Sequence, residues 1–165
     1  MKINKQYVVR YVSFSLALAL MVVIFIMSSQ DATRSSATSG GFIRSIAPLI
    51  KSNFHRLSAT EQDSFVEGLQ YVVRKGAHFS AYALLAALVS IGMFTFQRLK
   101  NVLGAVLSLI VCVLYSVSDE IHQSFVPGRS CGLRDVVIDT TGALLGCLLV
   151  WAISQLIKRK RACRN

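Results

Sequence analysis

Residues 102–123 read VLGAVLSLIVCVLYSVSDEIHQ, an almost wholly apolar run that ends directly in a cluster of charged and hydrogen-bonding side chains. A helix needs about 20 predominantly apolar residues to cross a bilayer core of about 30 Å. Three other runs in the chain approach that length. The sequence therefore predicts four membrane-spanning helices, at residues 11–27, 77–97, 101–118 and 139–157.

The composition favours a membrane protein over a soluble helical bundle. Hydrophobic residues make up 53% of the 165 residues, and the apolar runs lack the charged outer face that helices of a soluble bundle carry. The first run, preceded by Lys2, Lys5 and Arg10, could instead be a secretory signal peptide. Its apolar stretch exceeds about 15 residues and no A-x-A-like site follows Met27, so we expect an uncleaved anchor.

The formal net charge of +10 predicts the orientation of the chain. If the N-terminus is cytoplasmic, four spans return the C-terminus to the cytoplasm. Ten of the 18 basic residues then lie inside with no acidic residue, and the other eight lie outside with all eight acidic residues. This agrees with the positive-inside rule. We therefore expect cytoplasmic termini and a basic tail, KRKRACRN, that contacts anionic lipid and not nucleic acid.

The segment between the first two spans has two parts. SSQDATRSSATSGG, rich in small polar residues, is typical of a flexible exposed loop. In GFIRSIAPLIKSNF, apolar residues at helical spacing oppose Arg44 and Lys51, which predicts a short helix in the outer membrane interface, shortened or kinked by Pro48. The sequence leaves open whether residues 31–57 close over a site.

The next segment, Ser58-Ala-Thr-Glu61, has the form of a capping box, so a helix is expected to begin there and continue into the second span. The whole chain, 1–165, is then a single all-α domain. It is predicted to be a four-span transmembrane helical bundle with an extracytoplasmic loop that contains a short interfacial helix.

Polar side chains share one face on each of the last three spans when residues are placed at 100° intervals. All three faces end at the outer surface. Charged groups near a membrane are costly unless they pair or reach water, so we expect them to converge on an outward-facing pocket. The expected site residues are Arg74, Lys75, His78, Tyr82, Asp119, Glu120, His122, Gln123, Arg129, Asp135 and Asp139. The same residues could instead form a structural ion-pair network that fixes helix register.

The cysteines and glycines give weaker signals. Cys112 and Cys147 lie in spans, Cys163 lies in the tail and Cys131 lies outside alone, so neither a disulfide framework nor a zinc site is expected. The GxxxG motif of the fourth span, residues 142–146, allows close approach of another helix.

Four segments resemble the VanZ-like family of small bacterial membrane proteins. They are SSQ at 28–30, RKGAHFSAY at 74–82, SDEIHQSFVPGR at 118–129 and DVVIDTTGALLG at 135–146. The resemblance implies a multi-pass protein of the bacterial plasma membrane, linked to low-level resistance to the glycopeptide teicoplanin, with no established reaction. The family positions carried over are Lys75, His78, Phe79, Asp119, Glu120, His122, Gln123, Arg129, Asp135 and Gly142. The family commonly has Asn where this chain has Asp139.

Three kinds of function follow from these features. A binding protein would hold an anionic lipid headgroup or a lipid-linked cell-envelope precursor with its basic residues. An enzyme acting on a lipid phosphate or glycan would draw its acid–base groups from His78, Asp119, Glu120 and His122. A structural protein would join a larger envelope protein through a helix that packs on Gly142 and Gly146.

A metal site is a variant of the enzyme hypothesis. His78 and His122, with Asp119 and Asp135, could bind a divalent cation. Neither histidine stands in an HExxH or similar pattern, so the sequence predicts no metal and no cofactor. The binding function is the one that the sequence favours.

Overall fold

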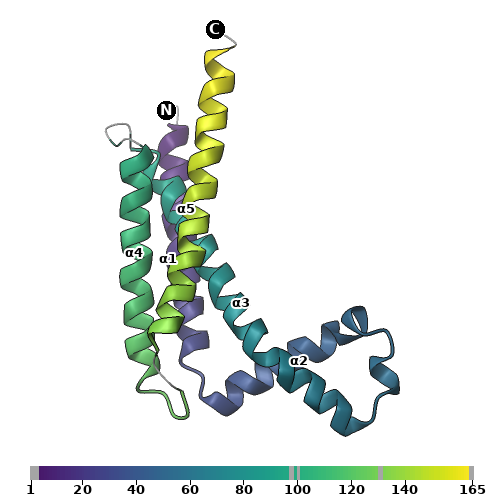
Figure 1. Ribbon diagram of the computed structural model, residues 1–165. Helices are drawn as coiled ribbons and strands as arrows, with labels where there is room; N and C mark the ends of the chain where they lie inside the picture. The colour runs from purple at the N-terminus through teal and green to yellow at the C-terminus, as the bar shows by residue number, and fades with distance from the viewer. Residues whose placement is uncertain (1–3, 97–98, 100, 130–131, 164–165) are drawn as a thin grey trace.

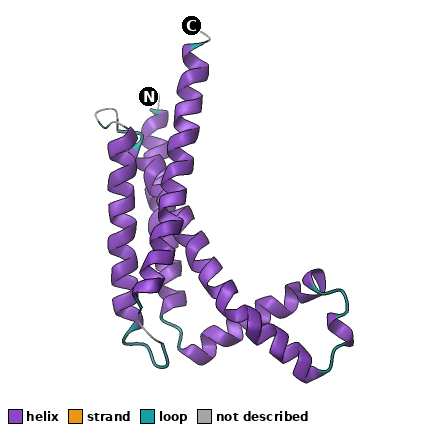
Figure 2. Ribbon diagram, in the orientation of Figure 1, coloured by secondary structure: helices purple, strands orange, loops and turns teal. Residues whose placement is uncertain are grey.

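The computed structural model describes residues 4–96, 99, 101–129 and 132–163. This part of the chain is all-helical (Figure 2). The elements are α1 (Lys5–Ser28), α2 (Ala32–Ile50), the short 3-10 helix η1 (Phe54–Arg56), α3 (Ala59–Met93), α4 (Asn101–Gln123) and α5 (Leu133–Ala162) (Figure 1). The all-α fold class is therefore confirmed.

Four of these helices, α1, α3, α4 and α5, are long and apolar enough to cross a membrane. Both ends of the chain lie at one end of the bundle, together with the link between α3 and α4 (Figure 1). The links between α1 and α2 and between α4 and α5 lie at the opposite end. The four predicted spans fall on these four helices, except that the second runs past the end of α3 at Met93. Residues 94–96 are not helical, and residue 97 lies outside the described residues.

Large apolar side chains cover the outer faces of the bundle. Examples that are 40–65% exposed are Leu16, Leu18, Val22, Val23, Val106, Ile110, Leu114, Leu144, Leu148, Leu149 and Ile153. A soluble monomer rarely exposes apolar surface on this scale. These faces suit contact with lipid chains, while a smaller core that includes Tyr82, Leu85, Ala86 and Cys112 joins the helices.

Helix α5 packs against α3 with no side chain between the two backbones at Gly142 and Gly146. A Cβ atom at Gly142 would lie 2.2 Å from Phe79 O, and one at Gly146 would lie 2.0 Å from Ala83 O. The close approach predicted from the GxxxG motif is thus made within the chain. The glycine face, which the sequence suggested for a partner helix, is covered by α3.

The capping box at Ser58 is present: Glu61 N donates to Ser58 Oγ, and Ser58 N donates to Glu61 Oε2. It starts α3, whose 35 residues extend about 50 Å. That length exceeds a bilayer core, and the first half of α3 leaves the bundle obliquely (Figure 1). This half, α2 and η1 form an arm around a cluster of Ile43, Ala47, Phe54 and Val66.

The predicted flexible loop after the first span is wrong, because residues 32–41 are the first half of α2. Asp31 caps this helix by accepting a hydrogen bond of 2.7 Å from Arg34 N. Ser39 donates to the carbonyl oxygen of Ser35 four residues earlier, so its hydroxyl is satisfied within the helix. Small residues also let α2 approach α3: a Cβ at Gly40 would lie 3.3 Å from Gln70 Nε2. The interfacial helix predicted for residues 41–54 is thus the second half of a longer helix, which ends two residues after Pro48.

The described cysteines, Cys112, Cys147 and Cys163, are free thiols, the first two buried and the last exposed. Cys131 lies outside the described residues. So do Lys2, Arg98, Lys100 and Arg164 from the expected basic side.

Candidate functional site

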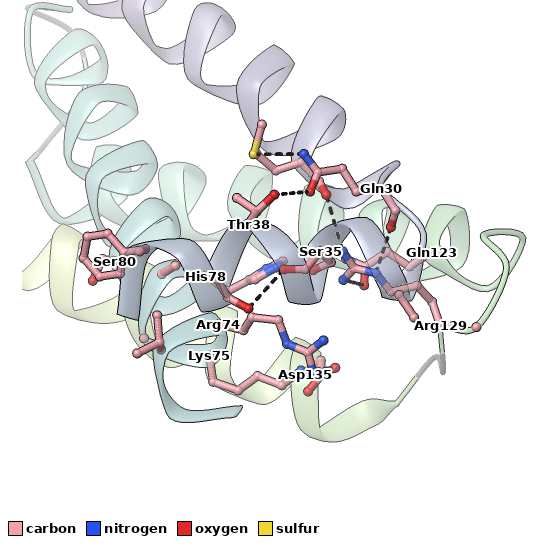
Figure 3. Close-up of a pocket in the computed structure, with 18 residues that line it drawn as sticks. Gln30, Ser35, Thr38, Arg74, Lys75, His78, Ser80, Gln123, Arg129 and Asp135 are labelled. Carbon is pink, nitrogen blue, oxygen red and sulfur yellow. Dashed lines mark hydrogen bonds and ion pairs between the residues drawn. The ribbon is translucent and has the colours of Figure 1, made fainter. Parts of the chain in front are cut away.

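A cavity of about 670 Å³ lies where the arm meets the bundle (Figure 3). Its walls come from α2, from residues 73–80 of α3, from the end of α1 and the α1–α2 link, and from the α4–α5 link with the adjoining ends of α4 and α5. The polar and charged lining residues are Gln30, Ser35, Thr38, Ser39, Arg74, Lys75, His78, Ser80, Gln123, Arg129 and Asp135. The cavity therefore uses polar groups from segments far apart in the sequence.

The charge on the lining is predominantly positive. Arg74, Lys75 and Arg129 face one carboxylate, Asp135. Lys75 is ion-paired with Asp135, and both side chains are about four-fifths buried. Arg74 has no ion-pair or hydrogen-bond partner within the described part of the chain. The cavity thus holds a guanidinium group that remains available to an anion.

Arg129 also caps the C-terminal end of α1. Its Nε donates to Gln30 O at 3.1 Å, and its Nη1 donates to Gln123 Oε1 at 3.2 Å. Its Nη2 donates to Met27 O at 3.4 Å. The last carbonyl groups of a helix lack partners within the helix, and a cation there also complements the helix dipole. Burial and the neighbouring charge of Arg74 lower the pKa of Arg129 from its ordinary value.

The turn before Arg129 sets its position. Gly128 adopts φ +73°, the left-handed region that favours glycine, after Pro127. The carbonyl oxygen of Pro127 accepts a hydrogen bond of 3.3 Å from Ala32 N at the start of α2. This hydrogen bond joins the α4–α5 link to α2. Two segments that line the cavity are therefore fixed relative to each other.

Behind the lining lies a cluster that we call the histidine–carboxylate cluster, formed by His78 of α3, Asp119 of α4 and Asp139 of α5. One ligand-type atom from each residue lies within 4.8 Å of the other two. His78 Nδ1 is 3.7 Å from Asp139 Oδ1. Both aspartates are buried, whereas the side chain of His78 is 25% exposed and lines the cavity. An imidazole flanked by carboxylates can exchange a proton or bind a cation.

Neutral donors hold the two aspartates in place. Ser28 Oγ and Gln123 Nε2 donate to Asp119 Oδ2 at 2.9 and 3.1 Å. Ser116 Oγ donates to Asp139 Oδ2 at 3.1 Å. The other oxygen of each carboxylate, Oδ1, is buried without a hydrogen-bond partner among the described residues.

Three of the expected site residues do not line the cavity and do not belong to the histidine–carboxylate cluster. Glu120 is buried, and its carboxylate accepts a hydrogen bond of 2.8 Å from the backbone N–H of Gly132, the N-cap residue of α5. His122 stacks on Phe25, with ring centroids 4.5 Å apart, and shares a hydrogen bond of 3.0 Å with Ser29 Oγ. Tyr82 is fully buried in the core. The expected convergence of all these groups is thus only partial.

The structure also adds a wall that the sequence did not predict. Ser35, Thr38 and Ser39 belong to the first half of α2, which was expected to be a loop, and Phe42 belongs to the part of α2 that was predicted to be helical. The sequence did contain one signal. The small or apolar residues at positions 35, 39, 43 and 47 stand four positions apart, and all four are buried in the structure. That spacing is typical of one helix face.

Four apolar helices around a buried polar cluster, with a cationic cavity at one end, define a polytopic helical membrane protein. The chain belongs to the VanZ/LLP1 family, whose model matches residues 13–156. The resemblance seen in the sequence motifs is therefore confirmed. Comparison with curated proteins and with solved structures gave no significant match.

Proposed function

We propose that the cavity binds the anionic headgroup of a membrane lipid or of a lipid-linked cell-envelope precursor. The observation that carries this proposal is the excess of cations in the lining, Arg74, Lys75 and Arg129 against Asp135. A planar guanidinium binds phosphate through two parallel hydrogen bonds, and an ammonium group acts as a point charge. Arg74 is the principal candidate because the described residues leave it without a partner.

The remaining lining suits an amphiphile. Met27, Phe42 and Val73 supply apolar surface, and Ser35, Thr38 and Ser39 of α2 supply hydroxyl oxygen atoms. The hydroxyl groups of Thr38 and Ser39 already donate to carbonyl groups of their own helix. Binding sites commonly combine mostly apolar walls with a few placed polar groups. A headgroup can therefore lie against Arg74 while its apolar chains follow the exposed faces of the helices.

The orientation in this proposal has both termini in the cytoplasm of a bacterial cell and the cavity at the outer leaflet. The basic end of α5, with Arg159, Lys160 and Arg161 in its last turn, supports it through the positive-inside rule. A protein that engages a lipid-linked precursor at that surface would change how a glycopeptide reaches its target. This is the route by which we connect the cavity to low-level teicoplanin resistance.

The test is lipid mass spectrometry on the full chain purified in mild detergent, comparing wild type with Arg74→Gln. Arg134→Gln is the matched control, because Arg134 is exposed and lies outside the cavity lining. We expect one phosphate-bearing lipid class to be enriched with wild type and with Arg134→Gln. Loss of a charged hydrogen bond worth about 1.5–3 kcal/mol should reduce its retention by tenfold or more in Arg74→Gln.

The identity of the enriched species distinguishes an ordinary phospholipid from a lipid-linked precursor. Equal lipid content in wild type and Arg74→Gln, with equal thermal stability, would overturn the proposal. Enrichment of neutral lipids alone would also overturn it.

A further inference from the structure

We propose that His78, Asp119 and Asp139 bind a divalent metal ion of the Mn²⁺ or Zn²⁺ type. This site is additional to the headgroup cavity and does not depend on it. The three ligand-type atoms lie within 4.8 Å of one another. Ligand atoms about 2.1 Å from a shared ion lie about 3–4 Å apart, so a small contraction of the cluster completes the site.

The first argument is charge. Asp119 and Asp139 are 3% and 2% exposed, and no Lys or Arg of the described residues forms an ion pair with either. Lys75 is paired with Asp135, and Arg129 is bound to carbonyl groups and to Gln123. Buried charges are normally paired or coordinate a metal. A divalent cation would supply the positive charge that the two carboxylates lack.

The second argument is that one oxygen atom of each aspartate is buried without a hydrogen-bond partner among the described residues. Oδ2 of each aspartate accepts hydrogen bonds from Ser28, Gln123 or Ser116, whereas Oδ1 of each has no partner among the described residues. Asp139 Oδ1 is also the atom that lies 3.7 Å from His78 Nδ1. Metal ligands are typically oriented in this way, with one atom held by outer hydrogen bonds and the other directed at the ion.

The third argument is that the backbone is arranged to bring these residues together. Gly142 lies against the carbonyl group of Phe79, the residue that follows His78. Asp139 precedes Gly142 by three residues and so lies on the same face of α5. The contact between the two backbones therefore positions Asp139 beside His78.

The cavity gives an ion access to this cluster. His78 lines the cavity, and Gln123, which also lines it, donates to Asp119. Two carboxylates and one imidazole suit Mn²⁺, Zn²⁺ or Fe²⁺. Three protein ligands would leave a coordination position open, as in catalytic zinc sites. A phosphate oxygen of a bound headgroup is chemically suited to it.

The experiment uses the full chain in detergent, stripped with EDTA, freed of the chelator and titrated with Mn²⁺ in the absence of added lipid. Free Mn²⁺ is followed by its electron paramagnetic resonance signal. We expect one bound ion per chain in wild type and binding weaker by at least about tenfold in His78→Gln and Asp139→Asn. Asp63→Asn is the control, because Asp63 lies on the arm and is ion-paired with Arg44. A Zn²⁺ competition series should displace the Mn²⁺.

A second readout does not need the variants to fold. Electron spin-echo modulation of wild-type protein with bound Mn²⁺ should show coupling to the ¹⁴N of a histidine. Absence of a bound ion in wild type, or a bound ion without nitrogen coupling, overturns the proposal. Retention of wild-type affinity in both His78→Gln and Asp139→Asn overturns it as well. Because no lipid is present, failure here leaves the result for Arg74→Gln and headgroup binding unaffected.

Discussion

The backbone of Gly146 on α5 lies directly against the carbonyl group of Ala83 on α3, so that a Cβ atom at position 146 would be 2.0 Å from Ala83 O. No real Cβ contact is this short, and the obstructing atom belongs to the backbone of a helix. The two helices would have to separate to admit a methyl group.

We therefore expect Gly146→Ala to destabilise the protein by about 1–3 kcal/mol, the usual cost of overpacking. This is a net loss even though alanine favours a helix by about 1 kcal/mol over glycine. Thermal unfolding of the purified protein measures it. Gly68→Ala is the control: Gly68 is exposed in α3 with nothing within 4 Å of an added Cβ, so this change should stabilise slightly. Equal stability of the two variants would contradict the close packing.

The sequence predicted the spans because lipid-facing helices must be apolar along about 20 residues, and that signal survives without knowledge of the tertiary structure. The start of α3 was predicted because a capping box is local. The first half of α2 was not predicted, because Ser35, Ser39 and Gly40 resemble a loop in composition. Their role depends on a close approach to α3 that only the folded chain supplies.

Contacts between helices also limited how much of the site could be predicted from the sequence. Helical spacing placed Arg74, Lys75 and His78 on one face of α3, and the structure has all three in the cavity lining. Spacing along a single helix could not decide which carboxylate faces His78. The candidate metal ligands Asp135 and His122 turn to Lys75 and Phe25 instead, because neighbouring helices set those contacts.

Glu120 is expected to stabilise the fold without taking part in binding. Its carboxylate accepts from Gly132 N at the start of α5. Glu120→Ala leaves that N–H without its partner, so we expect a loss of about 1–3 kcal/mol and faster amide exchange in the first turn of α5. Hydrogen exchange mass spectrometry checks this, with the exposed Glu67→Ala as control. Loss of Mn²⁺ binding by a Glu120→Ala protein that is still folded would instead assign Glu120 to the metal site.

His122 is expected to be dispensable for cation binding. Its ring stacks on Phe25, and its nitrogen is engaged with Ser29 at the end of α1. His122→Phe keeps the stacking and removes a hydrogen bond worth about 1 kcal/mol. We expect Mn²⁺ affinity to match wild type, whereas His78→Gln loses it. Loss of the ion in His122→Phe but not in His78→Gln would place the site around the other histidine.

Substitution of the two arginines of the cavity should affect headgroup binding and stability to different extents. Arg74 has no partner among the described residues, so Arg74→Gln should weaken headgroup binding and change the unfolding free energy by only about 0.5 kcal/mol or less. Arg129 donates to Met27 O, Gln30 O and Gln123 Oε1, so Arg129→Gln should weaken binding and also cost about 1.5–3 kcal/mol of stability.

Lipid retention and thermal unfolding, measured on the same preparations, check this contrast between the two arginines. Binding that depends on Arg74 should also fall as ionic strength rises, because the Debye length shortens from about 10 Å at 0.1 M to about 3 Å at 1 M salt. If Arg74→Gln unfolds as early as Arg129→Gln, Arg74 is a structural cation with a partner of its own. The anion-binding role of the cavity would then have to rest on Lys75, which is already neutralised by Asp135.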